Sequence, residues 1–291
     1  MESNPIKIFI FLFIFFSFTL LCAETRDIET EEVIVIFEGL QIAAAEEVAE
    51  VFPSVKEELT EALGLKVDFR PTVLLDRGGE VIRKTAGNAI FVAYAVPERS
   101  LIVLDTSRVY AKPFSLKSTL KHELCHLILH RNIEKIPQWF DEGVCQWASE
   151  GIAELMAEES EHALQKATVS CKLISIKDLH RFPPDNLTLA YEESKSIIEY
   201  IQKEFGRQGI IRVLGSLKGG YSLDESFQIG ISITPSRLEV QWYGYLKRKY
   251  TWFSYISRNI YEILFLIGAL ATLISFMRFL KRKKEYVDED K

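Results

Sequence analysis

An apolar stretch near the C-terminus, from Ile260 to Leu280, constrains the architecture of this chain more than any other feature. It is long enough to cross a bilayer as a helix, and its few charged residues, Glu262 and Arg278, lie near its ends. The basic cluster Lys281–Lys284 follows it, and such clusters mark the cytoplasmic end of a span. A buried core helix is the alternative, but the terminal position and the basic cluster favour a transmembrane helix over 260–280.

A shorter apolar stretch, from Ile8 to Leu21, lies at the N-terminus. Its length is typical of a signal-peptide core. A retained N-terminal anchor is the alternative for residues 1–23, because Leu21 is too large for a good cleavage site. Lys7 precedes the stretch and acidic residues follow it, so the positive-inside rule places the next segment outside the cytoplasm in both cases. We therefore expect a single-pass cell-membrane protein with an exported domain (24–250), a juxtamembrane segment (251–259), the transmembrane helix (260–280) and a cytoplasmic tail (281–291).

The exported segment begins with strand patterns and continues with helix patterns. β-Branched and aromatic runs predict strands over 31–39 and 65–75 and two more within 88–107, and a helix is expected over 40–64. Beyond Ser115 the patterns predict helices over about 115–131, 137–159, 188–205 and 208–217. This order indicates an α+β domain, with a small mixed N-terminal sheet followed by a C-terminal helical bundle. The net charge of −6 gives no basic face of the kind that nucleic-acid binding needs.

The sequence HELCH places His122 and His126 one helical turn apart, so that both imidazoles project from one face of the predicted helix. Two histidines at this spacing can bind one zinc ion. Glu123 lies between them, where it can take a proton from a zinc-activated water. Surface residues of an ordinary amphipathic helix are the alternative. The combination of the histidine pair with a carboxylate favours a Zn²⁺ site of a hydrolase.

A catalytic zinc site needs a third protein ligand. His130 continues the row of histidines, but a straight helix cannot wrap three ligands around one ion, so we expect His130 to interact with the helix C-terminus. Glu142 lies on the next predicted helix, after a loop short enough to make the two helices antiparallel. The predicted metal ligands are therefore His122, His126 and Glu142. The neighbouring Asp141 is expected to support the site from outside or to lie on the surface.

The motif HELCH, followed by a helix that carries WFDEG, resembles the gluzincin metallopeptidases, which include thermolysin and the zinc aminopeptidases. More closely, the chain resembles the peptidase MA-like domain of small bacterial proteins. The resemblance covers roughly residues 88–248 and includes two further segments, ISIKDLHRFPPDNLTLAYEESKSIIEYIQKEFG and SLDESFQIGISITPSRLEVQWYGYLK. It implies a zincin active-site helix that follows a sheet with a substrate-binding edge strand.

The resemblance also implies roles for single residues. It matches Glu123 to the general base and His122, His126 and Glu142 to the zinc ligands. Tyr191 falls where related zinc aminopeptidases have a tyrosine that binds the oxyanion, and a phenol suits that role because it donates a hydrogen bond as negative charge develops. A packing role on an amphipathic helix is the alternative for Tyr191.

The resemblance further implies that the edge strand at 88–94 binds the substrate backbone by strand addition. Two cysteines depart from the family pattern: Cys125 lies inside the motif, and Cys145 stands where alanine is common. We expect both to be small buried apolar side chains. The alternatives are a disulfide between the two helices and a thiolate that blocks zinc.

The leading interpretation is thus a membrane-anchored zinc metallopeptidase, a hydrolase that acts on a peptide or protein substrate outside the cytoplasm. The alternative is a catalytically silent gluzincin scaffold that binds a peptide or protein partner at the membrane surface. The intact ligand set together with Glu123 favours the enzyme, because a scaffold without activity has no need for these residues.

Overall fold

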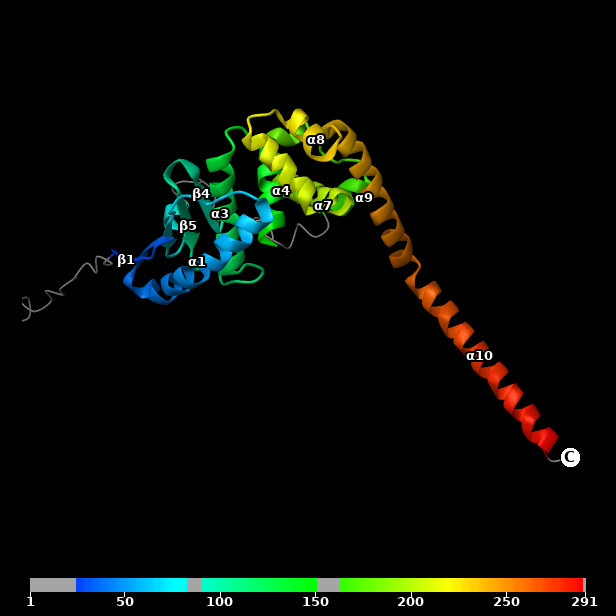
Figure 1. The fold of residues 1–291 in the computed structure, drawn as a ribbon. Helices are drawn as coiled ribbons and strands as arrows, with labels where there is room; N and C mark the ends of the chain where they lie inside the picture. Colours follow the sequence, from blue (N-terminus) through cyan, green and yellow to red (C-terminus); the bar gives the residue numbers. More distant parts are fainter. Residues whose placement is uncertain (1–24, 83–90, 151–162, 290–291) are drawn as a thin grey trace, which may run out of the picture.

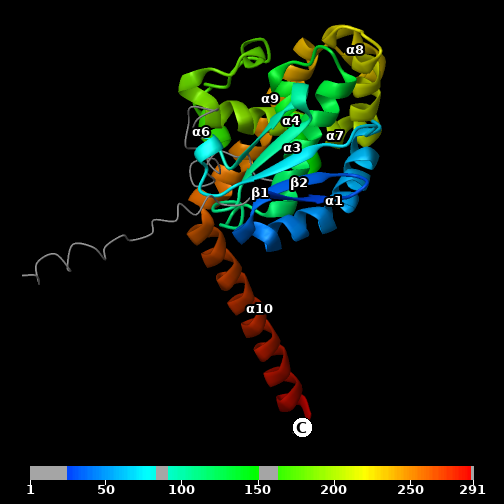
Figure 2. The ribbon, with the colours of Figure 1, turned by 90° about the vertical axis from the view of Figure 1, so that its left-hand side faces the viewer.

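The computed structural model describes residues 25–82, 91–150 and 163–289, and its N-terminal part is a five-stranded sheet (Figures 1 and 2). The sheet has the order β1-β2-β3-β5-β4, formed by β1 (Thr25–Glu29), β2 (Ile34–Glu38), β3 (Thr72–Asp76), β4 (Ala93–Val96) and β5 (Leu101–Asp105). The rest is helical and comprises α1 (Ile42–Leu63), α3 (Leu116–Asn132), α4 (Gln138–Ser149), α6 (Ala163–Val169), α7 (Leu187–Lys218), α8 (Leu223–Ile231), α9 (Pro235–Arg258) and α10 (Ile260–Glu289). The predicted α+β class is therefore confirmed.

The sheet is mixed, as expected. Strands β2, β3 and β5 are parallel neighbours, whereas β1 and β4 pair antiparallel at the two edges. β4 pairs with β5 in the register Ala93↔Leu104 to Val96↔Leu101, and the opposite edge of β4 faces away from the sheet. β1 escapes sequence analysis because TRDIE is polar and exposed, without the alternation of a half-buried strand. The predicted strand over 65–75 begins only at Thr72.

Helices α1 and α3 pack against each other and against the sheet. α1 buries an apolar stripe and tolerates Pro53 in its interior, and it ends at Gly64, whose φ of 65° requires glycine. α3 begins at Ser115, whose hydroxyl accepts a hydrogen bond from the N–H of Ser118. Most of α3 is buried, because the sheet, α1 and α4 all pack against it.

Helix α4 lies against both α3 and α7, and its contact with α7 depends on Gly143. A Cβ at position 143 would lie 2.5 Å from the backbone oxygen of Ser194, so no larger residue fits between the two helices. α7 contains one non-helical residue, Gly206, with φ 68°. The expected helices over 188–205 and 208–217 are thus the two parts of α7 on either side of Gly206. Pro137 caps α4 instead of starting it, and the expected continuation over 151–159 lies outside the described residues.

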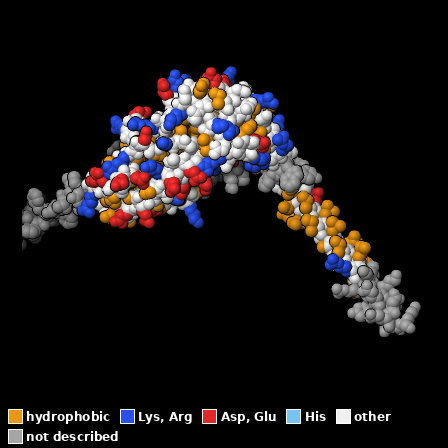
Figure 3. Space-filling model, viewed as in Figure 1, with side chains coloured by type: hydrophobic (Ala, Val, Ile, Leu, Met, Phe, Trp, Pro, Cys, Tyr) orange, Lys and Arg blue, Asp and Glu red, His pale blue; other side chains and the backbone are white. Residues whose placement is uncertain are grey.

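Helix α9 attaches α10 to the domain. α9 buries Leu238, Trp242 and Leu246, and the Trp242 indole donates a hydrogen bond of 3.1 Å to Ser196 Oγ on α7. The segment Ile260–Phe279 of α10 has a mean hydropathy of 2.1, and none of it is buried by the rest of the structure. It projects from the domain as an apolar rod (Figures 1 and 3), which excludes the buried core helix and leaves a helix long and apolar enough to cross a membrane. The N-terminal segment 1–23 lies outside the described residues.

Candidate metal centre

Three side chains converge where α3 meets α4. The Nε2 atoms of His122 and His126 lie 3.1 Å apart, as expected for histidines one turn apart on a helix. Glu142 Oε2 on α4 lies 3.7 Å from His122 Nε2 and 3.5 Å from His126 Nε2. Ligands bound at about 2.0–2.1 Å in a tetrahedron are about 3.3 Å from one another, so these distances fit one zinc ion. The structure therefore brings together the three residues that the sequence proposes as ligands.

Asp141 supports this cluster through hydrogen bonds to two histidines. Its carboxylate accepts hydrogen bonds from His126 Nδ1 at 3.0 Å and from His130 Nε2 at 2.8 Å. The bond to Nδ1 fixes the His126 ring so that Nε2 points at Glu142, which is the usual support for a metal-binding histidine. His130 thus lies outside the ligand set, as expected, but its partner is Asp141 and not the helix C-terminus. Of the two roles considered for Asp141, the structure gives it the supporting one.

The charges of this cluster compensate one another. Burial alone would raise the pKa of Glu142, but the charges of His126 and His122 and their hydrogen bonds hold it at about 2. The pKa of Asp141 is likewise lowered against the effect of burial, by His126 and His130. Burial would lower the pKa of His126, and the two carboxylates raise it well above its usual range. A divalent cation can take the place of the protons that balance these buried carboxylates.

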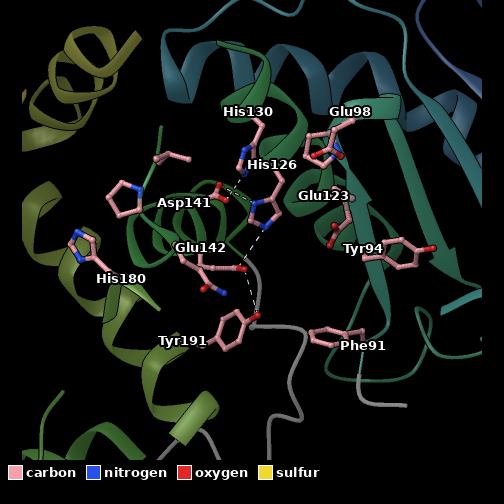
Figure 4. A pocket seen from close by; sticks show the side chains of 15 residues that line it. Phe91, Tyr94, Glu98, Glu123, His126, His130, Asp141, Glu142, His180 and Tyr191 are labelled. Carbon is pink, nitrogen blue, oxygen red and sulfur yellow. Dashed lines mark hydrogen bonds and ion pairs between the residues drawn. The ribbon is translucent and has the colours of Figure 1, made fainter. Parts of the chain in front are cut away.

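Glu123 and Tyr191 complete the inner wall of the cleft (Figure 4). Glu123 is 2% exposed and lies on α3 between the two histidines. The Tyr191 hydroxyl, on α7, lies 3.5 Å from Glu142 Oε1, and its ring packs edge-on against Phe182 with a centroid distance of 4.9 Å. Tyr191 is therefore fixed with its hydroxyl directed at the metal cluster, which goes beyond simple packing. Its position depends on Gly143, because α7 approaches α4 at that residue.

The cleft has a volume of about 680 Å³. One wall is the free edge of β4 with Tyr94 and Ala95, preceded by Phe91. The opposite wall includes His180, the last residue of the helical turn Asp178–His180. Residues 88–90 of the predicted substrate strand lie outside the described residues, so the structure places only its C-terminal part at the cleft.

Sequence reasoning did not single out His180 and Phe182 as site residues. Their place in the segment before the helix of Tyr191 is the only signal that points to them, since the loop carries the family's FP pair. His180 lines the cleft and Phe182 packs on the Tyr191 ring because their segment is held against α7, where Glu193 accepts the Ile174 N–H.

Cys125 and Cys145 form a disulfide between α3 and α4, with a Cα–Cα distance of 5.4 Å. The expectation of two separate buried thiols is therefore wrong, and the alternative, a disulfide, is right. The pairing arises because the antiparallel helices bring two buried positions face to face, a relation that spacing along the sequence does not show. His126, Asp141 and Cys145 also lie close together, but the disulfide leaves no thiolate for a metal in this second group.

The fold and the site define a zincin-type peptidase scaffold, with two antiparallel helices that bring two histidines and a glutamate to a cleft beside an edge strand. The family model of the peptidase MA superfamily matches residues 89–248, more than half of the 291 residues, and the chain belongs to this superfamily. The predicted family is thus confirmed. Comparison with curated protein sequences gives no match.

Among solved structures, the fold is similar to that of yeast LTA4 hydrolase in complex with Bestatin, with 11% sequence identity and a TM-score of 0.42. The alignment covers 81% of this chain and 37% of that chain. The chain therefore spans little more than a third of the length of that structure.

Proposed function

We propose that this protein is a membrane-anchored zinc metallopeptidase that hydrolyses peptide bonds outside the cytoplasm. The observation that carries the proposal is the convergence of His122, His126 and Glu142, at distances that fit one zinc ion, beside the buried carboxyl group of Glu123. Membership of the peptidase MA superfamily supports the same reaction class.

Each residue of the cleft has a distinct part in this chemistry. Zinc, when bound by the three ligands, would lower the pKa of a water molecule and polarise the substrate carbonyl. Glu123 accepts the proton of the attacking water and returns it to the leaving amine. The Tyr191 hydroxyl donates a hydrogen bond to the carbonyl oxygen as negative charge develops there. Asp141 keeps the His126 ring in the orientation that presents Nε2.

Two features support a location outside the cytoplasm. Helix α10 is apolar and unburied over Ile260–Phe279, and the sequence places the basic cluster Lys281–Lys284 after it. The Cys125–Cys145 disulfide is typical of oxidising compartments. In intact vesicles with the cell's orientation, external protease should therefore digest the domain and spare the C-terminal tail, and digestion of the tail would reverse the topology.

The test of catalysis is Glu123→Gln. The amide keeps nearly the same shape but cannot accept a proton, so kcat for a mixed peptide library should fall by about 10²–10⁴-fold while bound zinc stays at one per chain. Tyr191→Phe should cost about a hundredfold, because it removes one donor to the oxyanion. The control is Glu47→Gln, which changes a half-buried glutamate whose partner is Tyr110, away from the cleft, and it should leave activity unchanged. No hydrolysis by the zinc-loaded wild type above the background of Glu123→Gln would favour the silent scaffold, and equal hydrolysis above background by both would reject Glu123 as the general base.

A further inference from the structure

A second cavity adjoins the catalytic cleft. It has a volume of about 760 Å³ and lies between the loop that joins α3 to α4 and the turn that joins α7 to α8. The two cavities share four lining residues: His130, Ile136, Pro137 and His180. Because the same four side chains border both hollows, the second cavity directly adjoins the cleft, and we call the two together the groove.

The metal cluster lies in the middle of this groove and not at its end. In Figure 4, His126 and Glu142 lie between Tyr94 on one side and His180 on the other. Tyr94 belongs to strand β4, which among the described residues is the edge of the sheet and pairs only with β5, so that an extended peptide backbone can pair with its outer side. His180 borders the second cavity. A bound chain can therefore extend from β4 across the metal cluster and beyond it.

The second cavity has a mixed lining of apolar and polar side chains. Leu217, Leu223 and Tyr221 come from the α7–α8 side, and Ile136 and Pro137 come from the α3–α4 loop. The charged residues of the lining, Glu134, Lys135 and Glu225, carry both signs of charge, and His130 and His180 lie where the cavity meets the cleft. The carboxylate of Glu225 already accepts hydrogen bonds from the Ser222 N–H and hydroxyl at 2.9 and 2.6 Å, in the capping box of α8. Such a lining suits an apolar side chain of a peptide better than a charged chain terminus.

We propose that the groove binds an extended internal segment of a polypeptide, with one part along β4 and a large apolar side chain in the second cavity. Resting on the proposed function, this makes the protein an endopeptidase, since residues on both sides of the scissile bond are bound. A peptidase that releases single terminal residues needs room for only one residue on one side of its metal. Here each of the two hollows has the volume of a site for a drug-sized ligand.

The test uses the full-length, zinc-loaded protein in detergent and peptides blocked at both termini. The protein should cleave them internally. Extending them on one side with a leucine or phenylalanine that reaches the second cavity should raise kcat/KM by about tenfold, the effect of burying one large apolar side chain. Tyr221→Ala should reduce this gain. Tyr110→Ala is the matched control, because Tyr110 is 51% exposed against 52% for Tyr221 but lies away from the groove.

The inference is overturned if only peptides with a free terminus are hydrolysed, one residue at a time, or if the gain from extension persists in full in Tyr221→Ala. A second measurement separates it from the proposed function. Affinity for fluorescent blocked peptides, measured by anisotropy with Glu123→Gln, should rise with peptide length and fall in the combination with Tyr221→Ala. If no peptide is hydrolysed but affinity still follows this pattern, the groove binds polypeptide and the proposed peptidase function is rejected. Absence of both hydrolysis and length-dependent binding rejects both proposals.

Discussion

Buried carboxyl groups on α4 and on α7 are in different charge states. Asp141 and Glu142, on α4, are surrounded by three histidines, and the pKa values of both carboxyl groups are lowered. Glu193, on α7, forms no ion pair with a cation of the described residues: its carboxyl group accepts the Ile174 N–H at 3.0 and 3.2 Å, and burial, helped by nearby Glu239, raises its pKa to about 8. Burial is similar, so the neighbours decide whether the group is charged.

The difference shows two uses of a buried carboxyl group. The pair at positions 141 and 142 keeps its charge, which a metal ion can balance. Glu193 keeps its proton at neutral pH and binds the backbone of Ile174 to α7. Glu239 on α9 accepts the Ile176 N–H at 3.2 Å and so binds the same segment to α9. The same segment leads to His180, which lines the cleft, and to Phe182, which packs on Tyr191. One group therefore serves binding and the other serves the placement of a cleft wall.

The strongest way to break this comparison is Glu142→Ala. Removing a direct ligand should reduce zinc affinity by more than the about 10–100-fold that loss of an outer partner costs. Asp141→Asn should fall within that smaller range, because it keeps the shape, leaves the three ligands in place and weakens the bonds to His126 and His130. Zinc titration against a competing chelator measures both. Wild-type affinity in Glu142→Ala would show that the glutamate is not a ligand.

A smaller effect is expected from removing the disulfide that joins the two helices of the metal cluster. The Cys125–Cys145 disulfide closes a loop with a sequence separation of 20 residues, and replacing both cysteines by alanine should lower the free energy of unfolding by about 3 kcal/mol. Denaturant unfolding of the wild type and the double variant measures it. Cys171→Ala, which changes an exposed free cysteine, is the control and should leave stability unchanged. Equal stability of the double variant would mean that helix packing alone holds α3 on α4.

The smallest effect concerns the neutral carboxyl group of Glu193 and depends on pH. Because the folded pKa of Glu193 is raised to about 8 from its ordinary value of 4.5, its contribution to stability is complete below about pH 4.5 and is lost as pH rises through 8. Glu193→Gln removes this pH-dependent loss, and its amide oxygen can still accept the Ile174 N–H. The stability of the variant relative to wild type should therefore rise steadily between about pH 5 and pH 8.5, measured by thermal unfolding. A difference that does not change with pH would mean that Glu193 is charged in the folded protein.

Sequence analysis captures what is encoded over short distances. The α+β order follows from local patterns, and His122, His126 and Glu142 come together because they lie on consecutive helices joined by a short loop. Membership of the peptidase MA superfamily follows from motifs on the same helices.

What escapes the sequence depends on packing between distant segments. The bond from His130 to Asp141 and the pairing of Cys125 with Cys145 require the actual rotation of α4 on α3. The proton held by Glu193 depends on residues 174–176 and on α9, far along the chain. Strand β1 escapes for another reason, since a polar edge strand carries no apolar alternation.

The way α9 passes into α10 has a consequence for where the cleft would stand. Tyr250 on α9 still packs against the core, and α10 begins at Ile260, so about 15 Å of nearly continuous helix separates the domain from the apolar rod. With the topology proposed above, a helical connection of this length would join the domain to the bilayer in place of a flexible linker. The groove would then stand at a fixed distance from the lipid surface and would favour chains that pass at that distance over those that diffuse freely in solution.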